Sequence, residues 1–329
     1  MIFDFKRPMA EDASFLAPFF VLRPNKTCDS GWIDTFIWSD YYRIRYCIVD
    51  NKALFLLMQD GEEYFAAMPY CRQEELPFYF KAFEQYFNEE LHKPFKIYLA
   101  DDEAVAFLRL QDNPDYYVKE EEDLKDYLYD ADELRTLPGK KFQKKRNLVH
   151  KFEREYEGRY EYRTLRCEDR PQIMQFLKKW FSDRMQQETD AEKTLEYEYR
   201  GIVEILQKCC QLQYRMGGVF VDGELEAFSI GAYNEPEKMA CVSVEKANTE
   251  IQGIYQVVNQ QFLIHEFPDA QLVNREDDLG LEGLRKAKQS YNPIGYERKF
   301  MVLQKNFQGY MNELIDHYEA EIQEYGTEH

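Results

Sequence analysis

The sequence has no long apolar run. No window holds about 18 uninterrupted apolar residues, the shortest stretch that reads as a membrane-spanning helix. The first residues, MIFDFKRPMAEDASF, include acidic side chains where a secretory signal would carry an apolar stretch. We therefore expect a cytoplasmic protein without integral membrane contact.

Histidine is scarce, and the spacing of the cysteines is poorly suited to a zinc site or an ordinary disulfide. The five histidines form no HxxxH pair and the seven cysteines no CxxC pair, while Cys209 and Cys210 are adjacent. These spacings predict no metal site and cysteines that stay reduced. The GxSxG, Walker and GxGxxG patterns are also missing, which removes the commonest signatures of serine hydrolases, P-loop enzymes and Rossmann dehydrogenases.

Apolar and aromatic residues are abundant. They make up 44% and 16% of the chain, enough for packed cores, and 329 residues exceed what one core usually serves. The expected division is a first domain over 1–135, a basic connector over 136–158 and a second domain over 159–329.

Charge is strongly acidic overall but reverses in one place. The formal net charge of -19 should repel nucleic acid and anionic membranes at long range. Residues 139–154, GKKFQKKRNLVHKFER, nevertheless hold seven bases and one acid, Glu153. Apolar residues such as Phe142 and Phe152 lie among them and indicate a segment that packs. The bases are either a solvated helix face or a basic patch that contacts tRNA.

Apolar spacing predicts the same element order in both halves. In the first half we expect strands at 42–49, 53–58 and 64–68, a helix at 74–88, a strand at 95–99, a helix at 102–109 capped by Asp101 or Asp102, and a strand at 116–120. In the second we expect a strand at 160–165, helices at 170–184 and 191–213, a hairpin turning at Asp222-Gly223, a strand at 239–244, a helix at 251–266, a strand at 270–274, a helix at 279–289 and a strand at 296–302. A docking helix at 307–325 would end the chain.

This order resembles the GNAT acyltransferase fold, in which central strands splay apart and the acyl donor enters the gap. More specifically, RTLPGKKFQKKRNLVHKFE and VNREDDLGLEGLRKAKQSYNPIGYERKF resemble a tandem-GNAT family allied to the C-terminal domain of phosphatidylglycerol lysyltransferase and to Fem-type aminoacyltransferases. The resemblance implies an α/β fold of two tandem GNAT-like domains with mixed sheets flanked by helices. It also implies an acyl- or aminoacyltransferase that bears no permanent cofactor.

The donor implied by the resemblance is acyl-CoA or aminoacyl-tRNA, and the acceptor an amine or hydroxyl on a small molecule or peptide. GNAT enzymes bind the pyrophosphate of CoA at a helix start with the pattern [Q/R]-x-x-G-x-[G/A]. Here Gln252 and Gly253 stand at that start, but Glu250 and Tyr255 occupy the flanking pattern positions. A carboxylate repels phosphate and a tyrosine hinders its approach, so the departures favour aminoacyl-tRNA.

The resemblance also suggests catalytic residues: Glu245, at the end of the central strand, as base, and Tyr291, after the last helix, as acid. It makes Val244, which precedes Glu245 beside the expected gap, a donor- or acceptor-binding candidate. Further binding candidates come from the residues themselves. Arg285 and Lys288 lie one turn apart on a helix that Asp277 or Asp278 should cap. Asn274 and Arg275 end a strand, and Lys144, Arg146 and Asn147 lie in the connector beside an expected cleft.

Every one of these candidates also has a purely structural interpretation, as a surface carboxylate, a packed aromatic or a base that favours the end of a helix. Two alternatives to an enzyme therefore stay open. One is a catalytically inactive tandem-GNAT module that binds a ligand. The other is an RNA-binding protein that uses the bases of residues 140–154.

Overall fold

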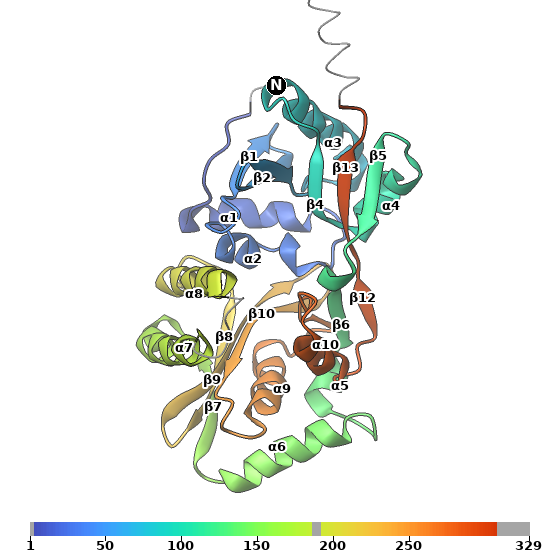
Figure 1. Cartoon of the computed structure of the whole chain (residues 1–329). Helices are drawn as coiled ribbons and strands as arrows, with labels where there is room; N and C mark the ends of the chain where they lie inside the picture. The colour runs from blue at the N-terminus through green and yellow to red at the C-terminus, as the bar shows by residue number, and fades with distance from the viewer. Residues whose placement is uncertain (1–2, 186–191, 308–329) are drawn as a thin grey trace, which may run out of the picture.

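Two mixed β-sheets, one beyond the other along the long axis, form the framework of the protein (Figure 1). The computed structural model describes residues 3–185 and 192–307. Helices cover the sheets, so the expected fold class, two GNAT-like units with mixed sheets flanked by helices, is confirmed. No helix among these residues is long and apolar enough to cross a membrane.

The first sheet has six strands. Their order is β1 (Arg45–Val49), β2 (Ala53–Asp60), β3 (Glu63–Ala66), β4 (Lys96–Asp101), β13 (Lys299–Gln304) and β5 (Tyr116–Glu120). Its helices are α1 (Ala13–Leu16), α2 (Trp32–Ile37), α3 (Leu76–Gln85) and α4 (Asp102–Phe107). The cap of α4 is as expected, because the Asp101 side chain accepts the N–H of Ala104 at 2.9 Å.

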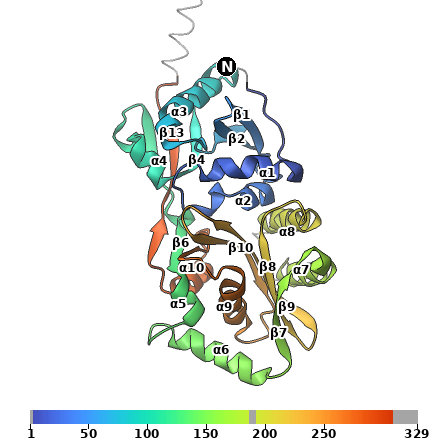
Figure 2. The same cartoon turned by 180° about the vertical axis from the view of Figure 1, so that it is seen from behind.

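The second sheet has seven strands. Their order is β12 (Gly295–Glu297), β6 (Asp126–Asp130), β11 (Leu272–Asn274), β10 (Met239–Ala247), β9 (Glu224–Asn234), β8 (Arg215–Val221) and β7 (Tyr160–Leu165). One face packs on α5 (Ala131–Thr136), α6 (Gln143–Glu155) and α9 (Ile254–Glu266), and the other on α7 (Arg170–Met185) and α8 (Glu192–Gln207). The views in Figures 1 and 2 place these helix layers on opposite sides.

The sheets exchange strands. β6 precedes residue 135 yet belongs to the second sheet, and β13 follows residue 159 yet lies between β4 and β5 of the first. The division between sheets therefore does not coincide with the domain boundaries expected from the sequence. The expected strand at 296–302 is wrong as one strand, because β12 and β13 enter different sheets. The expected helix at 307–325 lies almost wholly outside the described residues.

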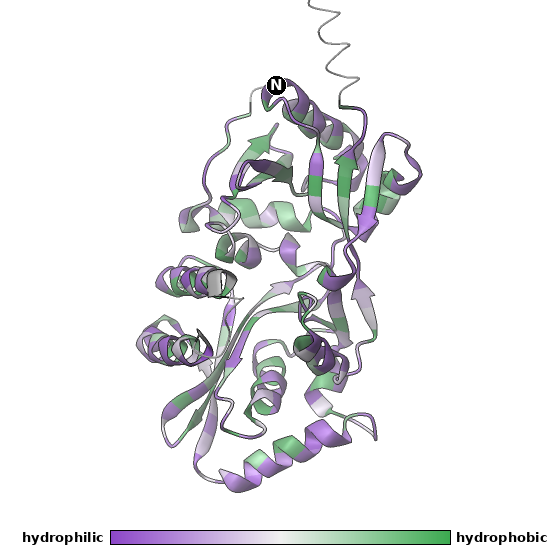
Figure 3. Ribbon diagram, in the orientation of Figure 1, coloured by the Kyte–Doolittle hydropathy of each residue, from purple (hydrophilic) through white to green (hydrophobic). Residues whose placement is uncertain are grey.

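Apolar packing also joins the two units. One continuous core cluster contains Phe36 and Ile37 of α2 together with Ile202 and Ile205 of α8. α8 approaches α2 so closely that a β-carbon on Gly201 would overlap the backbone carbonyl of Ile37. In Figure 3 hydrophobic and hydrophilic residues alternate along many of the strands, whereas α6 is largely hydrophilic.

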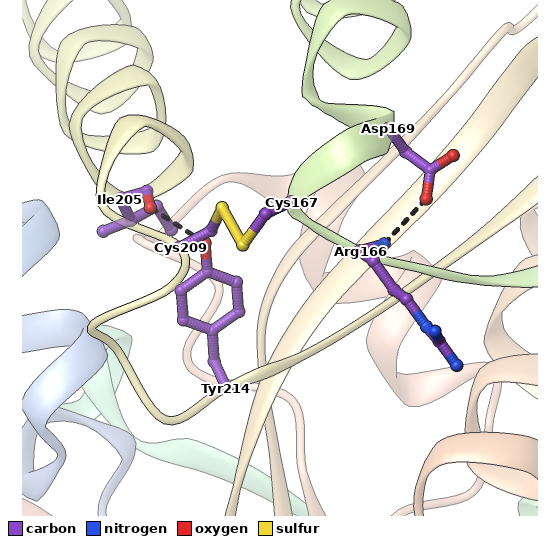
Figure 4. The surroundings of a disulfide bond; sticks show 6 residues. All are labelled: Arg166, Cys167, Asp169, Ile205, Cys209 and Tyr214. Carbon is purple, nitrogen blue, oxygen red and sulfur yellow. Dashed lines mark hydrogen bonds between the residues drawn. A yellow bond between two sulfur atoms is a disulfide. The ribbon is translucent and has the colours of Figure 1, made fainter.

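The prediction that all cysteines stay reduced is wrong. A disulfide joins Cys167, just before α7, to Cys209, just after α8 (Figure 4). Cys210 is free and exposed, and the other free thiols, at Cys28, Cys47, Cys71 and Cys241, are buried. Sequence spacing cannot reveal such a pair, because 42 residues separate its members.

Candidate functional site

The second sheet opens between β10 and β11. These parallel strands pair only from Met239–Leu272 to Cys241–Asn274, after which β10 runs on to Ala247. We call the space between residues 242–247 of β10 and residues 275–277 the fork. The register between β10 and β9 shifts between Val242 and Val244. Val244 turns into the core with α7 and α8 and is 2% exposed, so it offers no side chain to the fork.

An ion pair spans the fork. Nη2 of Arg275 donates to Oε1 of Glu245 at 2.8 Å, and Nδ2 of Asn259 on α9 donates to Oε2 of Glu245 at 3.1 Å. Burial lowers the pKa of Arg275, but Glu245, Tyr291 and Tyr129 together outweigh this effect, so the net shift is upward and the guanidinium stays charged. Nη1 of Arg275 is buried with no acceptor in hydrogen-bond geometry among the described residues. The Arg275 guanidinium also hydrogen-bonds the side chain of Tyr291. The fork thus presents a charged guanidinium whose Nη1 has no acceptor in hydrogen-bond geometry among the described residues.

Tyr291 and Lys145 complete this group, which we call the fork cluster: Lys145, Glu245, Arg275 and Tyr291. The Arg275 guanidinium carbon lies 4.8 Å from the centre of the Tyr291 ring, and Nζ of Lys145 lies 4.0 Å from it. Burial raises the pKa of Tyr291 to about 12, so its phenol keeps its proton. Burial, assisted by the charge of Arg275, lowers the pKa of Lys145 to about 8.

Helix α6 brings Lys145 to the fork because it lies against the start of α9. Gly253, the N-cap of α9, has φ of 92°, and a β-carbon there would be 2.5 Å from the carbonyl oxygen of Leu148 in α6. Only glycine fits this conformation and this contact. Nζ of Lys151 also donates to Oε1 of Gln252. The two residues predicted to meet a donor pyrophosphate therefore meet α6 instead.

The connector residues predicted to bind substrate do not reach the fork cluster. Arg146 donates from Nη1 to the carbonyl oxygens of Leu137 and Gly139, so it shapes the loop before α6. Lys144 and Asn147 lie on the exposed face of that helix. Their neighbour Lys145, which the sequence reasoning missed, is the residue that turns inward.

An acidic cluster lies beside the fork on the side of the first sheet. Oγ of Ser243 donates to Oδ2 of Asp34 at 3.2 Å, and Asp34 also hydrogen-bonds Glu276. Burial, with the nearby Asp29 charge, raises the pKa of Asp34 to about 7, and burial together with Asp34 raises that of Glu276 well above its usual range. The two carboxyl groups can therefore hold a proton between them near neutral pH. Glu276 adopts a positive φ of 58°, a strained backbone for this residue.

Lys299 ties the two sheets together beneath this cluster. It is 1% exposed, and its Nζ pairs with Asp29, with Asp126 at 2.6 Å and with Asp277 at 3.5 Å. Asn274 donates from Nδ2 to Oδ2 of Asp126 at 2.8 Å and to the carbonyl oxygen of Lys26 at 2.7 Å. Asn274, predicted as a binding residue, is thus engaged with the first unit.

Arg285 and Lys288 on α10 (Glu282–Gln289) are engaged as well. Arg285 pairs with Asp278 at 2.9 Å and with Asp123 at 2.5 Å. Lys288 is 9% exposed and donates from Nζ to the carbonyl oxygen of Arg275 at 2.5 Å, so it supports the residue that spans the fork. They do not present adjacent free charges.

The expected cap of this helix is wrong. α10 begins at Glu282 after Leu281, while Asp277 and Asp278 bond the N–H groups of Leu279 and Gly280 in the loop before it.

Two of the residues that the sequence reasoning missed carry a periodic signal. Lys145 shares a helix face with Val149 and Phe152, which are both buried, so helical spacing alone would have pointed it inward. Asn259 interrupts the apolar stripe of α9 between Val258 and Phe262 and is 1% exposed. A buried amide of this kind needs a partner, and here the partner is Glu245.

The connection from β10 to α9 also borders a cavity of about 90 Å³. Its lining includes Trp180, Asn248 and Tyr255. Nε1 of Trp180 donates to the carbonyl oxygen of Ala247 at 3.1 Å, which fixes α7 against the end of β10.

The whole architecture has counterparts among known proteins. A family model described as "Phosphatidylglycerol lysyltransferase, C-terminal" matches residues 23–303. A crystal structure of a conserved protein of unknown function from Bacteroides thetaiotaomicron is 27% identical, with a TM-score of 0.83 over 92% of this chain and 100% of that one.

Two further relatives are more distant. The structure of L-PGS from Bacillus licheniformis is similar with a TM-score of 0.65 at 16% identity, over 90% of this chain and 93% of that one, which shows a shared fold. An uncharacterised protein from Mycoplasmoides gallisepticum is 25% identical over 54% of this chain, and the match spans 55% of that relative's length.

Proposed function

We propose a function from one premise: this chain belongs to the family of phosphatidylglycerol lysyltransferase C-terminal domains. The proposed activity is transfer of an aminoacyl group from aminoacyl-tRNA to an amine or hydroxyl of a small-molecule or peptide acceptor. The observation that carries it is the meeting of Lys145, Arg275 and Tyr291 at the fork, supported by Glu245.

The proposed reaction is displacement at an ester carbonyl. The acceptor's nitrogen or oxygen attacks the acyl carbon, the bond from that carbon to the tRNA ribose oxygen breaks, and the acceptor's proton replaces it on the leaving oxygen. Nη1 of Arg275, for which no described residue offers an acceptor in hydrogen-bond geometry, is the donor suited to the developing oxyanion. Lys145, with a pKa of about 8, is the group suited to take the acceptor's proton near neutral pH.

Tyr291 and Glu245 receive different roles. The phenol of Tyr291 stays protonated, so it can donate to the leaving oxygen. Glu245, predicted from the sequence as the base, has one oxygen bonded to Arg275 and the other to Asn259. We assign it the positioning of Arg275 and give the role of base to Lys145.

Two features support an aminoacyl ester over acyl-CoA as donor. The start of α9 lies against the backbone of α6, which takes the place a CoA pyrophosphate would need. The acidic cluster of Asp34 and Glu276 contacts Ser243, two residues before Glu245 on β10. Carboxyl groups at this place would favour the cationic amino group of an aminoacyl ester.

The exposed face of α6 supports tRNA as the carrier. Lys144 of α6 and Lys140, in the turn before this helix, are solvent-exposed, and Lys144 is adjacent to Lys145, which reaches the fork cluster. Because the rest of the chain is acidic, this basic patch within residues 139–154 is where a phosphate backbone would be attracted.

A transfer assay tests the proposal. Purified protein is mixed with tRNA charged with labelled amino acids and with amine and hydroxyl acceptors, and in parallel with acetyl-CoA. We expect transfer from charged tRNA alone and its loss in Lys145→Met. Lys286→Met is the matched control, because Lys286 is exposed and its ion pair, with Glu282, is also exposed. Absence of transfer from every charged tRNA, with ligand binding unaffected by Lys145→Met and Tyr291→Phe, would instead favour the catalytically inactive binding module.

A further inference from the structure

Three cysteine sulfurs gather at the base of the α7–α8 pair. Cys167 lies in the single-turn helix Cys167–Asp169 before α7, and Cys209 and Cys210 lie in the turn after α8. The disulfide joins Cys167 to Cys209, and the three Sγ atoms all lie within 4.8 Å of one another. Figure 4 shows the bond beside Tyr214, whose Oη donates to the carbonyl oxygen of Ile205 at 2.8 Å. A free thiol therefore stands next to a disulfide.

We propose that Cys210 is an exchanging thiol and that the cross-link alternates between Cys167–Cys209 and Cys167–Cys210. The thiolate of Cys210 attacks Sγ of Cys167, the new sulfur–sulfur bond forms as the old one breaks, and Cys209 leaves as a thiolate. The proton that Cys210 gave to water returns to Cys209. The exchange is redox-neutral and needs no oxidant or reductant.

Geometry selects the sulfur of Cys167 as the point of attack. Attack on Cys209 would join neighbouring residues, whose Cα atoms are about 3.8 Å apart, whereas disulfides usually join Cα atoms about 4.4–6.8 Å apart. The existing bond spans Cα atoms 5.7 Å apart, within that range. Moving the bond to Cys210 keeps a long-range cross-link, and Sγ of Cys210 already lies within 4.8 Å of Sγ of Cys167.

Exposure distinguishes the two forms. Cys210 is exposed, whereas Cys209 is partly buried and packs against the core cluster shared by α7 and α8. Exchange thus exposes a different thiol and moves the cross-link between Cys167 and the turn from Cys209 to Cys210, one residue along the chain. The same turn contacts Glu11 of the first unit through Lys208 at 3.9 Å and Gln211 at 3.5 Å. The position of the cross-link therefore affects a contact between the two units.

The test is mapping of disulfide connectivity in the folded, full-length protein. Wild type, Cys210→Ser and Cys209→Ser are equilibrated with oxidised glutathione, alkylated with iodoacetamide and digested for mass spectrometry. The buried thiols of Cys47 and Cys71 report folding, because they label only if the protein opens.

In wild type we expect alkylated Cys209 and alkylated Cys210 in different molecules, each with Cys167 in a disulfide. In Cys209→Ser we expect a Cys167–Cys210 bond, and in Cys210→Ser only the original bond. Free Cys167 and Cys210 in folded Cys209→Ser would overturn the proposal. So would a wild type in which Cys210 alone is ever labelled, since that result means that no exchange occurs.

Discussion

Lys299→Met is the sharpest test of how the two units are held together. Lys299 is 1% exposed and faces three carboxylates, Asp29, Asp126 and Asp277, that come from both units. These carboxylates raise the pKa of Lys299 well above its usual range although burial acts to lower it. Methionine keeps most of the side-chain volume and removes only the charge, so the change isolates the electrostatic contribution.

The expected loss is large because the acids left behind are buried. Removing one partner of a buried ion pair costs about 3–5 kcal/mol, and for a chain of 329 residues that corresponds to a fall in melting temperature of roughly 4–7 °C. At low pH the carboxylates that faced Lys299 take up protons, which limits the loss of folding stability in Lys299→Met. Asp277 already has its pKa raised to about 6, chiefly by burial, and Asp126 is raised as well.

The sign of the pH dependence follows from these pKa values. Without Lys299 the folded-state pKa values of Asp126 and Asp277 rise further above those of the unfolded chain. The folded state then binds more protons than the unfolded state above about pH 4, so stability falls as pH rises. The destabilisation by Lys299→Met should therefore be greater at pH 8 than at pH 5.

Thermal and urea unfolding of wild type, Lys299→Met and Lys286→Met at both pH values check this reasoning. Lys286→Met removes an exposed lysine and should change stability by less than about 0.5 kcal/mol. An equal loss for Lys299→Met at pH 5 and pH 8 would refute the argument, because it would mean that packing and not charge holds the site.

Three further predictions follow from single residues. If Lys145 is the base, the aminoacyl transfer rate of wild type should rise with pH and level off above about pH 8, because burial lowers the pKa of this lysine to about 8. The rate of Lys145→Arg, measured over the same pH range, should lack that rise. Gly253→Ala should destabilise the protein by more than about 1 kcal/mol in urea unfolding, because its β-carbon would meet the carbonyl oxygen of Leu148 at a φ of 92°; unchanged stability would contradict the close approach of α6. Asp34 has its pKa raised from 3.8 to about 7, so the folded state holds a proton that the unfolded state lacks in this range and stability falls as pH rises. Asp34→Asn cannot lose that proton and should lose less stability than wild type between pH 5 and pH 8 in the same experiment.

Much of the element order was predictable from the sequence because it depends on local periodicity. The hairpin at Asp222-Gly223, the helix expected at 251–266 and the cap at Asp101 all appear in the structure. Glu245, Arg275 and Tyr291 were chosen from strand ends and helix ends, and the structure brings all three together at the fork. Residues at the ends of strands could be chosen from the sequence because the carboxyl ends of neighbouring parallel strands lie at the same edge of a sheet.

What only the tertiary structure decided is which charges are free. Asn274, Arg285 and Lys288 have the residue types of ligand-binding groups, but each is engaged by partners distant in the sequence. Lys145 became the lysine of the fork cluster because α6 packs across α9, a contact that depends on Gly253.

The exchange of β6 and β13 between sheets and the Cys167–Cys209 bond belong to the same class of facts. Local periodicity sets whether a segment is helix or strand, since it reflects only the faces that a segment buries. Strand order, disulfide partners and ion-pair partners depend on which distant segments meet, and that choice is made by the free energy of the whole fold and not of any one segment.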